Sequence, residues 1–418
     1  MNLLIVIAIV LLAILGTPLF AVIGASALWN FHRAGIDPQA VVINFWGLAE
    51  LPVLLAIPLF TFAGYILSES GAPDRLVRLT REALGWMPAG LAIVALLTCA
   101  FFTAFTGGSG VTIIAVGALL FPALMQAGYA EKFSLGLITS AGSLGLLFAP
   151  SLPLILYGVV AEVPIHDMFL AGILPGFVML TGVCTYAVWK NKAIKVPLGE
   201  FSWRRWKGAI KESIWELPLP FFVLGGIYSG YFAISEAAAV TALYVIVVNV
   251  FVLREIPLRE LPRIMRESMT LVGGILLILG VSLASTNYMI DAGVPQKLLA
   301  AISVYVSGRV SFLLLLLAFL LVLGAILDIF SALALVVPLI LPVAISFGIH
   351  PVHLGIIFLA TMELGYLTPP VGLNLFISSY RFERSIMQVY VSTLPFFAVL
   401  LLAVMLITFW PELSLLLL

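Results

Sequence analysis

Charged residues are scarce in this chain. Only 10% of its 418 residues are Asp, Glu, Lys or Arg, and 63% are apolar, whereas soluble domains carry about 25% charged residues. This composition excludes an ordinary water-soluble protein and indicates one that lies within a membrane. The 20 basic residues are balanced by 20 acidic ones. No excess of positive charge is left to attract a nucleic acid, so we predict no nucleic-acid partner and a lipid bilayer as the surrounding medium.

Cysteines and catalytic motifs are also few or absent. The two cysteines, Cys99 and Cys184, lie far apart in apolar segments, which favours small buried residues over a disulfide or a metal site. The sequence contains no H-E-x-x-H, G-x-S-x-G or G-x-x-x-x-G-K-S/T motif, so it lacks the common patterns of metalloproteases, serine hydrolases and nucleotide-binding loops. We therefore predict that the chain is not an enzyme and needs no organic cofactor.

Long apolar runs are abundant. A hydrocarbon core about 30 Å thick requires about 20 helical residues, and runs of this length are typical of helices and not of barrel strands. The first run has no basic leader, so we expect a retained span and not a cleaved signal. The fold class predicted is therefore an all-α polytopic membrane protein. Its candidate spans are 3–26, 49–68, 168–189, 236–253, 268–290 and 390–409.

Basic residues predict the orientation of the chain. Lys and Arg gather in the polar connections 190–216 and 254–266, and the positive-inside rule places both in the cytoplasm. Three further arginines fall within 72–86, where Leu76 and Leu79 share one helical face. This pattern predicts an amphipathic arm helix on the cytoplasmic surface.

Two segments with polar centres favour helical hairpins. The stretch TGGSGVT lies between two apolar arms within about 90–130, and span parity requires both ends of this region on the cytoplasmic side. We interpret it as a re-entrant hairpin whose tip stops inside the membrane, with two ordinary spans joined by an outside glycine turn as the alternative. Asp328 and Ser331 occupy the same position within 311–349, which favours a second re-entrant hairpin from the opposite face.

Two other apolar segments are interrupted by proline and glycine. They read GSLGLLFAPSLP at 142–153 and GYLTPPVGLNLF at 365–376. Proline removes a backbone donor and glycine weakens a helix. A broken helix is tolerated within a membrane only where protein or a bound polar group satisfies the freed backbone atoms. We therefore predict broken helices over about 132–161 and 352–379.

The two halves of the chain also match each other. A shift of 220 residues places Gly145 on Gly365 and Pro150 on Pro370, and with the predicted orientation this gives inverted-topology repeats. Such repeats with paired broken helices mark the binding site of many secondary transporters, where freed carbonyls and hydroxyls bind a hard cation and helix N-termini bind an anion. The predicted parts are an N-terminal span and loop (1–48), a first repeat (49–189), a basic connection (190–216) and a second half containing the second repeat (217–411).

Several segments resemble the large membrane subunit of tripartite ATP-independent periplasmic (TRAP) transporters, over nearly the whole chain. The resemblance implies a sodium-coupled importer of a small organic acid, such as a dicarboxylate, a keto acid or a sialic acid, that works by an elevator motion. The segments are IPLFTFAGYIL (57–67), TGGSGVT (106–112), GSLGLLFAPSLPLILYGVV (142–160), MFLAGILPG (168–176) and HLGIIFLATMELGYLTPPVGLNLF (353–376).

The same resemblance implies partners and a location. The partners are a small four-span membrane subunit and a soluble periplasmic binding protein that delivers the substrate. The location is the cytoplasmic (inner) membrane of a bacterium or archaeon, with the chain crossing it several times. A stand-alone sodium/carboxylate symporter of a related fold, without a binding protein, remains the alternative.

The resemblance finally implies sites for two coupling sodium ions and the substrate. Many family members read SGSS where this chain reads TGGS, so Gly108 lacks a hydroxyl. For Glu363 we favour a bracing hydrogen bond over cation binding. The first sodium site would be Thr106, Gly107, Gly108, Ser109, Gly142, Gly145 and Pro150. The second would be Asp328, Ser331, Gly365, Thr368, Pro369 and Gly372. The substrate would lie near Ser109, Ser151 and Asn374.

Overall fold

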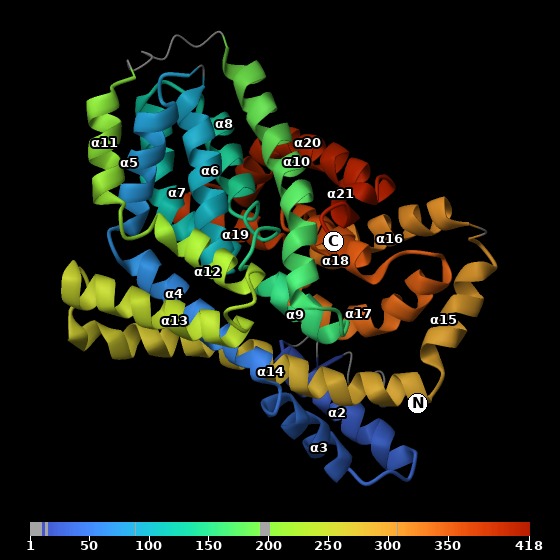
Figure 1. Cartoon of the computed structure of the whole chain (residues 1–418). Helices are drawn as coiled ribbons and strands as arrows, with labels where there is room; N and C mark the ends of the chain where they lie inside the picture. Colours follow the sequence, from blue (N-terminus) through green and yellow to red (C-terminus); the bar gives the residue numbers. More distant parts are fainter. Residues whose placement is uncertain (1–10, 13–15, 88, 193–200, 307) are drawn as a thin grey trace.

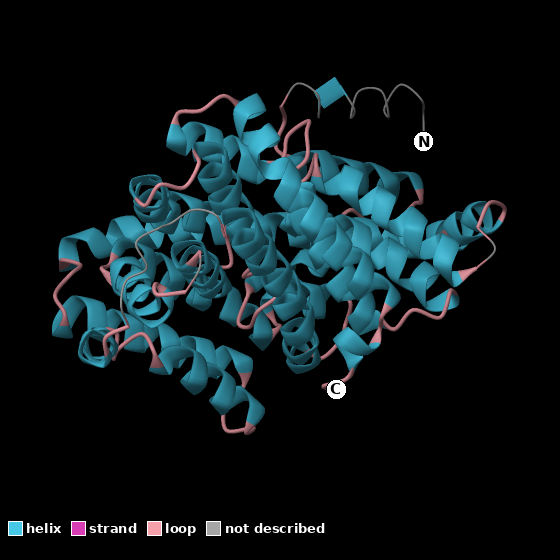
Figure 2. Cartoon of the chain, turned by 90° about the horizontal axis from the view of Figure 1, so that it is seen from above, coloured by secondary structure: helices cyan, strands magenta, loops and turns pink. Residues whose placement is uncertain are grey.

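The computed structural model describes residues 11–12, 16–87, 89–192, 201–306 and 308–418. Within these ranges the chain forms helices and no strands (Figure 1, Figure 2). The predicted all-helical polytopic fold is confirmed. Most of the first half of the predicted span 3–26 and part of the basic connection lie outside the described residues, and in that span from residue 16 onward a helix begins at Leu19 and continues to Arg33. Seven helical segments of the described part are long and apolar enough to cross a membrane: Pro52–Glu69, Ser109–Gln126, Ile165–Asn191, Ile234–Val252, Leu258–Asp291, Ile329–Ser346 and Ile386–Phe409.

One group of helices, which we call the scaffold layer, runs along the lower part of Figure 1. Within it α13 packs on α4, and α14 packs on α2, α3 and α4. Close approach between α3 and α14 depends on a glycine, because a Cβ atom at Gly280 would lie 2.1 Å from the Phe45 ring. The layer comprises α2 (Leu19–Arg33), α3 (Gln39–Ala49), the 3₁₀ turn η1 (Pro52–Leu55), α4 (Ala56–Glu69), α13 (Ile234–Ile246) with its π-helical extension η2 (Val247–Val252), the turn η3 (Leu258–Glu260) and α14 (Leu261–Asp291).

The first half of the chain continues from the scaffold layer into a helical hairpin. Helices α6 and α7 pack against each other and are joined by Gly107 and Gly108. Gly107 has φ +65°, a left-handed conformation that glycine adopts without a steric cost, and this reverses the chain. The elements are α5 (Ala72–Leu84), α6 (Gly90–Thr106), α7 (Ser109–Gln126), α8 (Glu131–Ala141), α9 (Leu152–Val160) and α10 (Ile165–Asn191).

The second half repeats this order of elements. Helices α7 and α17 begin at positions 109 and 329, and α8 and α18 begin at 131 and 351. The turns that precede α8 and α18 contain Gly128 and Gly348, with φ +86° and +74°. The elements are α15 (Val294–Ser303), α16 (Arg309–Gly324), α17 (Ile329–Ser346), α18 (Pro351–Gly365), α19 (Leu373–Phe382), α20 (Ile386–Phe409) and the short α21 (Glu412–Leu415).

The two halves exchange helices at the centre of the molecule. Helix α9, which follows the first break, packs on α17, and α19, which follows the second break, packs on α7. Helix α18 is buried around its whole circumference over 352–365, as expected for a helix that is apolar on nearly all sides. Unlike α6 and α7, the arms α16 and α17 diverge, because α16 packs mainly on α18 while α17 packs on α14 and α9.

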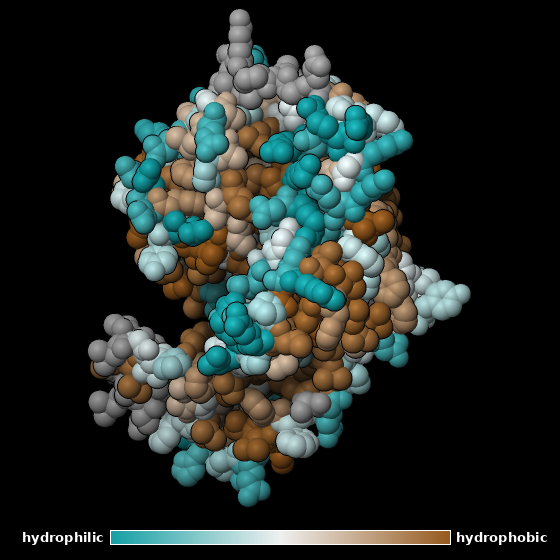
Figure 3. Space-filling model, turned by 90° about the vertical axis from the view of Figure 1, so that its left-hand side faces the viewer, coloured by the Kyte–Doolittle hydropathy of each residue, from teal (hydrophilic) through white to brown (hydrophobic). Residues whose placement is uncertain are grey.

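Ion pairs tie the arm helix α5 to two distant connections. Arg75 Nη2 lies 2.5 Å from Glu216 Oε1, and Arg75 also pairs with Glu255, which accepts a hydrogen bond from the Gly71 amide at 2.8 Å. Burial alone would raise the pKa of Glu255, but the hydrogen bonds from Arg75 and Gly71 hold this pKa below its usual range. Helix α11 (Trp203–Glu212) packs on α5 and is followed by α12 (Pro218–Tyr228). A hydrophilic band crosses this side of the molecule (Figure 3).

Candidate functional site

The first hairpin touches the first break near the hairpin tip. The Thr103 hydroxyl of α6 donates a hydrogen bond to the Gly142 carbonyl at 2.8 Å and lies 2.6 Å from the Thr112 hydroxyl of α7. A Cβ atom at Gly145 would lie 2.2 Å from the Ala100 carbonyl oxygen, so no side chain fits there. One threonine therefore joins both hairpin arms to the break. The sequence analysis did not single out Thr103. Its position one helical turn before Thr106 would have placed its hydroxyl on the same face of α6 as the tip residue.

The tip itself carries most of the residues predicted for the first sodium site. Thr106 and Ser109 are buried, and a Cβ atom at Gly107 would lie 2.5 Å from the side chain of Leu152, the first residue of α9. On the other side, a Cβ atom at Gly64 of α4 would lie 2.7 Å from Thr106 Cα. The tip is thus enclosed between the scaffold layer and the broken helix.

Within the first break the backbone folds into successive tight turns. The amides of Leu146 and Phe148 donate to the carbonyls three residues before them, at 2.9 and 3.0 Å. Pro150 is buried and follows a cis peptide bond. The Ser151 hydroxyl donates to the Leu146 carbonyl. Because that proton is used within the break, Ser151 has its oxygen lone pairs left to offer a ligand.

Asp328 caps α17 at the second tip. Its Oδ1 accepts hydrogen bonds from the Phe330 and Ser331 amides, both at 3.0 Å, and its Oδ2 accepts one from the Ser331 hydroxyl at 2.5 Å. An aspartate at this position satisfies the orphan amides of a helix start and faces the positive end of the helix dipole. The structure therefore gives Asp328 and Ser331 an organising role at the tip.

The second break lies directly on this tip. The amides of Val371 and Gly372 donate to the Ala325 carbonyl at 3.0 and 3.2 Å. A Cβ atom at Gly365 would lie 2.5 Å from Gly324 Cα. The tip and the break are consequently held together backbone to backbone, with no room for a side chain.

Other predicted residues of the second site have different surroundings. The Thr368 hydroxyl donates to the Gly365 carbonyl at 2.7 Å, while Pro369 is exposed. Gly372 has φ +53°. The hydroxyl of Tyr366, which sequence reasoning missed, accepts a hydrogen bond from the Ile329 amide at 2.7 Å and fixes the start of α17 to the broken helix.

Two of the predicted substrate residues, Ser109 and Asn374, are on helices α7 and α19, which pack together, while Ser151 precedes α9. Asn374 is fully buried on α19, and its amide nitrogen donates to the Thr139 carbonyl of α8 at 3.2 Å, while its Oδ1 has no hydrogen-bond partner among the described residues. A Cβ atom at Gly110 would lie 2.7 Å from the Ile377 side chain, so α19 lies against the first turn of α7, which begins at Ser109. No hydrogen bond among the described residues joins Ser109, Ser151 and Asn374 to one another.

The prediction that Glu363 forms a bracing hydrogen bond is wrong. Glu363 is 1% exposed, and neither carboxylate oxygen has a hydrogen-bond partner in the described part of the chain. The reason is its place on α18, which apolar helices enclose on all sides. A buried ionised carboxylate without a partner is very unfavourable, so Glu363 is the most anomalous polar group of this region.

The described residues include no group of three or more His, Cys, Asp or Glu that could hold a metal. At the two places where a hairpin tip meets a broken helix, the chain instead offers hydroxyls, backbone carbonyls and one carboxylate. These groups are the ligands of hard cations. Interrupted helices that meet at the centre of an apolar bundle are a recurrent way to build a transport site. Fold and site together define a polytopic membrane protein of the transporter class.

Comparison with protein families identifies the group within this class. The family described as "Tripartite ATP-independent periplasmic transporter, DctM component" matches residues 3–413. The chain belongs to this family. The resemblance predicted from the sequence is therefore confirmed, and so is the prediction that the chain is not an enzyme, because the members are transporter permeases.

Several relatives are similar over most of the chain. The C4-dicarboxylate TRAP transporter large permease protein DctM of Pseudomonas aeruginosa is 33% identical over 90% of this chain and 88% of its own length. The protein of the same name from Rhodobacter capsulatus is 31% identical over 97% and 96%. The isethionate TRAP transporter permease protein DctMQ of Oleidesulfovibrio alaskensis is 33% identical over 95% of this chain, which spans 63% of that protein.

A solved structure shares the fold. The YdaH transporter of Alcanivorax borkumensis superposes with a TM-score of 0.59 over 90% of this chain and 88% of that one. The sequence identity is 16%, so this likeness concerns the arrangement of helices alone.

Proposed function

We propose that the chain is the large permease of a sodium-coupled importer of a small organic acid, which a periplasmic binding protein delivers. The observation that carries this proposal is the pair of contacts in which a helix tip meets a broken helix, once at Gly142 and once at Gly365. Together they concentrate oxygen ligands and helix ends inside a bundle that is otherwise apolar. The names of relatives support an organic solute, since they mention C4-dicarboxylates, isethionate and ectoine.

Each contact supplies oxygen atoms for one sodium ion. At the first, the carbonyls of 106–109 and 142–150 are joined by the hydroxyls of Thr103 and Thr112. At the second, Asp328 and Ser331 face 365–372. A carboxylate has about four acceptor positions, and three hydrogen bonds reach Asp328, so one position remains for a cation.

The anionic substrate would lie between the two contacts, near Ser109, Ser151 and Asn374. Helices α7, α9 and α19 all begin there, at Ser109, Leu152 and Leu373. Helix N-termini offer free amides and partial positive charge to an anion. Neither break, 142–153 or 365–376, contains an arginine, so helix ends, the Asn374 amide and the bound sodium ions would balance the carboxylate.

The arrangement of the halves supports inverted repeats and an elevator motion. In Figure 1, α6 and α7 lie in the left half of the molecule and α16 and α17 in the right half. The exchange of α9 and α19 between the halves joins both hairpins into one body. We propose that the hairpins are re-entrant from opposite faces and that this body moves past the scaffold layer to carry its cargo across the membrane.

The proposal includes two partners and a location. The partners are a small four-span membrane subunit and a periplasmic binding protein, and the location is the cytoplasmic (inner) membrane. The words tripartite and periplasmic in the family description support more than one component and a periplasmic one among them. The alternative is a stand-alone sodium/carboxylate symporter. Family membership over 3–413 favours the tripartite arrangement.

Uptake by reconstituted vesicles tests the proposal. Vesicles containing the chain and its small subunit, supplied with loaded binding protein, are expected to accumulate a labelled C4-dicarboxylate or isethionate only under an inward sodium gradient. Omitting either partner should reduce uptake to the level of empty vesicles. Strong uptake by the chain alone would favour the stand-alone symporter, and uptake that ignores the sodium gradient would refute coupling.

A further inference from the structure

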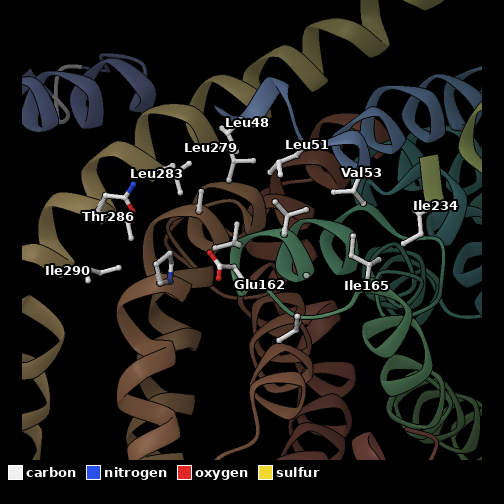
Figure 4. Close-up of a pocket in the computed structure, with 17 residues that line it drawn as sticks. Leu48, Leu51, Val53, Glu162, Ile165, Ile234, Leu279, Leu283, Thr286 and Ile290 are labelled. Carbon is white, nitrogen blue, oxygen red and sulfur yellow. The ribbon is translucent and has the colours of Figure 1, made fainter. Parts of the chain in front are cut away.

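A cavity of about 600 Å³ lies between the scaffold layer and the helices that follow the first break (Figure 4). On the scaffold side its wall includes Leu279 and Leu283 of α14 and Leu51 next to η1. On the other side it includes Ile165 of α10 and Pro338 of α17. The volume falls within the 300–1,000 Å³ typical of small-molecule sites, and the walls belong to two separate groups of helices.

One carboxylate lies at the edge of this apolar cavity. Glu162 is in the turn between α9 and α10 with φ +53°, and Figure 4 shows its carboxylate among the apolar side chains of the lining. It forms no hydrogen bond or ion pair with the described residues, and no Lys, Arg or His lines the cavity. Glu162 is exposed to solvent, so its negative charge stays accessible at the mouth of the cavity and has no basic partner among the described lining residues.

A second polar group lies deeper on the scaffold side. Thr286 of α14 is 3% exposed, and its hydroxyl oxygen has no hydrogen-bond partner among the described residues. A buried polar atom normally has a partner in the protein, in water or in a ligand. The lining of one cavity thus provides a buried, unpaired hydroxyl at Thr286 and a solvent-exposed carboxylate at Glu162.

We propose that this cavity binds a small apolar cation, such as a hydrophobic amine or a quaternary ammonium compound. The cationic group would pair with Glu162 at the edge of the cavity, and the apolar body would fill the space between α9, α14 and α17. An organic anion would be repelled by Glu162, so this site is distinct from the proposed transport site. A neutral lipid chain would fill the volume but gain nothing from the carboxylate.

Isothermal titration of the purified full chain in detergent with a matched pair of probes tests this proposal. Adamantylamine carries a cationic group, and adamantanol has the same apolar body without the charge. We expect the wild type to bind the amine about threefold to fivefold more tightly than the alcohol, because one ion pair at an exposed site supplies an advantage of at most this order. Glu162→Gln should remove this difference by lowering the affinity for the amine about threefold to fivefold, and should leave the alcohol unchanged.

Two controls keep the result specific. Glu412→Gln changes an exposed glutamate of α21 that does not line the cavity, and it should bind the amine as the wild type does. Ala334→Phe adds bulk to the α17 side of the lining and should abolish binding of both probes, with thermal unfolding as the check of its fold. Equal affinity of the wild type for amine and alcohol would overturn the proposal, and so would amine binding that Glu162→Gln does not weaken.

Discussion

Replacing Gly365 by alanine is expected to reduce substrate uptake about a hundredfold while the protein still reaches the membrane. The added Cβ atom would lie 2.5 Å from Gly324 Cα and 2.6 Å from its carbonyl carbon, so the second break must move away from the tip. The hydrogen bonds from the Val371 and Gly372 amides to the Ala325 carbonyl would then be lost. Misplacement of a binding site by about 1 Å can cost about 100-fold in rate. Initial uptake rates, normalised to the amount of protein in the membrane, measure the effect.

A matched glycine separates this effect from a general loss of helix flexibility. Gly273 is within α14, and a Cβ atom there would meet nothing within 4 Å. Gly273→Ala should therefore transport normally and gain about 0.5–1 kcal/mol of stability, because alanine restricts the unfolded chain. Normal uptake by Gly365→Ala would show that the close contact between tip and break is not needed for transport.

Replacing Arg75 by alanine is expected to destabilise the folded chain by about 3–5 kcal/mol, because it leaves a buried carboxylate without its partner. Glu216 is 2% exposed, and its Oε2 already lacks a hydrogen-bond partner among the described residues. Glu255 would lose the same arginine. The free energy of unfolding, or the thermal midpoint of the purified chain, measures the loss.

An exposed ion pair on the same helix provides the control. Arg78 and Glu212 are 2.9 Å apart, with side chains 53% and 43% exposed, so Arg78→Ala should cost only about 0–1 kcal/mol. Adding Glu216→Gln to Arg75→Ala should restore part of the stability, because it removes the orphan charge. Equal effects of Arg75→Ala and Arg78→Ala would mean that the buried ion pairs do not fasten the arm helix.

The element boundaries were largely predictable because they depend on local chemistry. Glycine and proline end helices for reasons that act within a few residues, and the predicted breaks contain the observed gaps between α8 and α9 and between α18 and α19. The arm helix was predictable from the apolar face that Leu76 and Leu79 share. Its observed extent, Ala72–Leu84, lies within two residues of the prediction.

The partners across the site were not predictable in the same way. Thr103 binds a carbonyl 39 residues away, and Tyr366 binds an amide 37 residues away. Every residue except proline has both backbone groups, so the sequence does not reveal which of them a hydroxyl will meet. The divergence of α16 and α17 likewise depends on α18 and α14, whose positions are set by packing over the whole chain.

The central claim is that two hairpins approach the middle of the membrane from opposite faces and end there against broken helices. Single cysteines placed at both ends of each hairpin test it directly, in a background where Cys99 and Cys184 are replaced by serine. Both natural cysteines are free, and Cys184→Ser changes a half-buried site. Retained uptake of the cysteine-free chain confirms that the background is intact.

The measurement is labelling of intact cells with a maleimide that cannot cross the membrane. Positions 86 and 131 flank α6 and α7, positions 305 and 346 flank α16 and α17, and all four residues are exposed. The account predicts that Tyr305→Cys and Ser346→Cys are labelled from outside, whereas Trp86→Cys and Glu131→Cys react only after the cells are opened. If only one of positions 86 and 131, and only one of positions 305 and 346, were labelled from outside, the arms would cross the membrane as ordinary spans. This result would contradict the account.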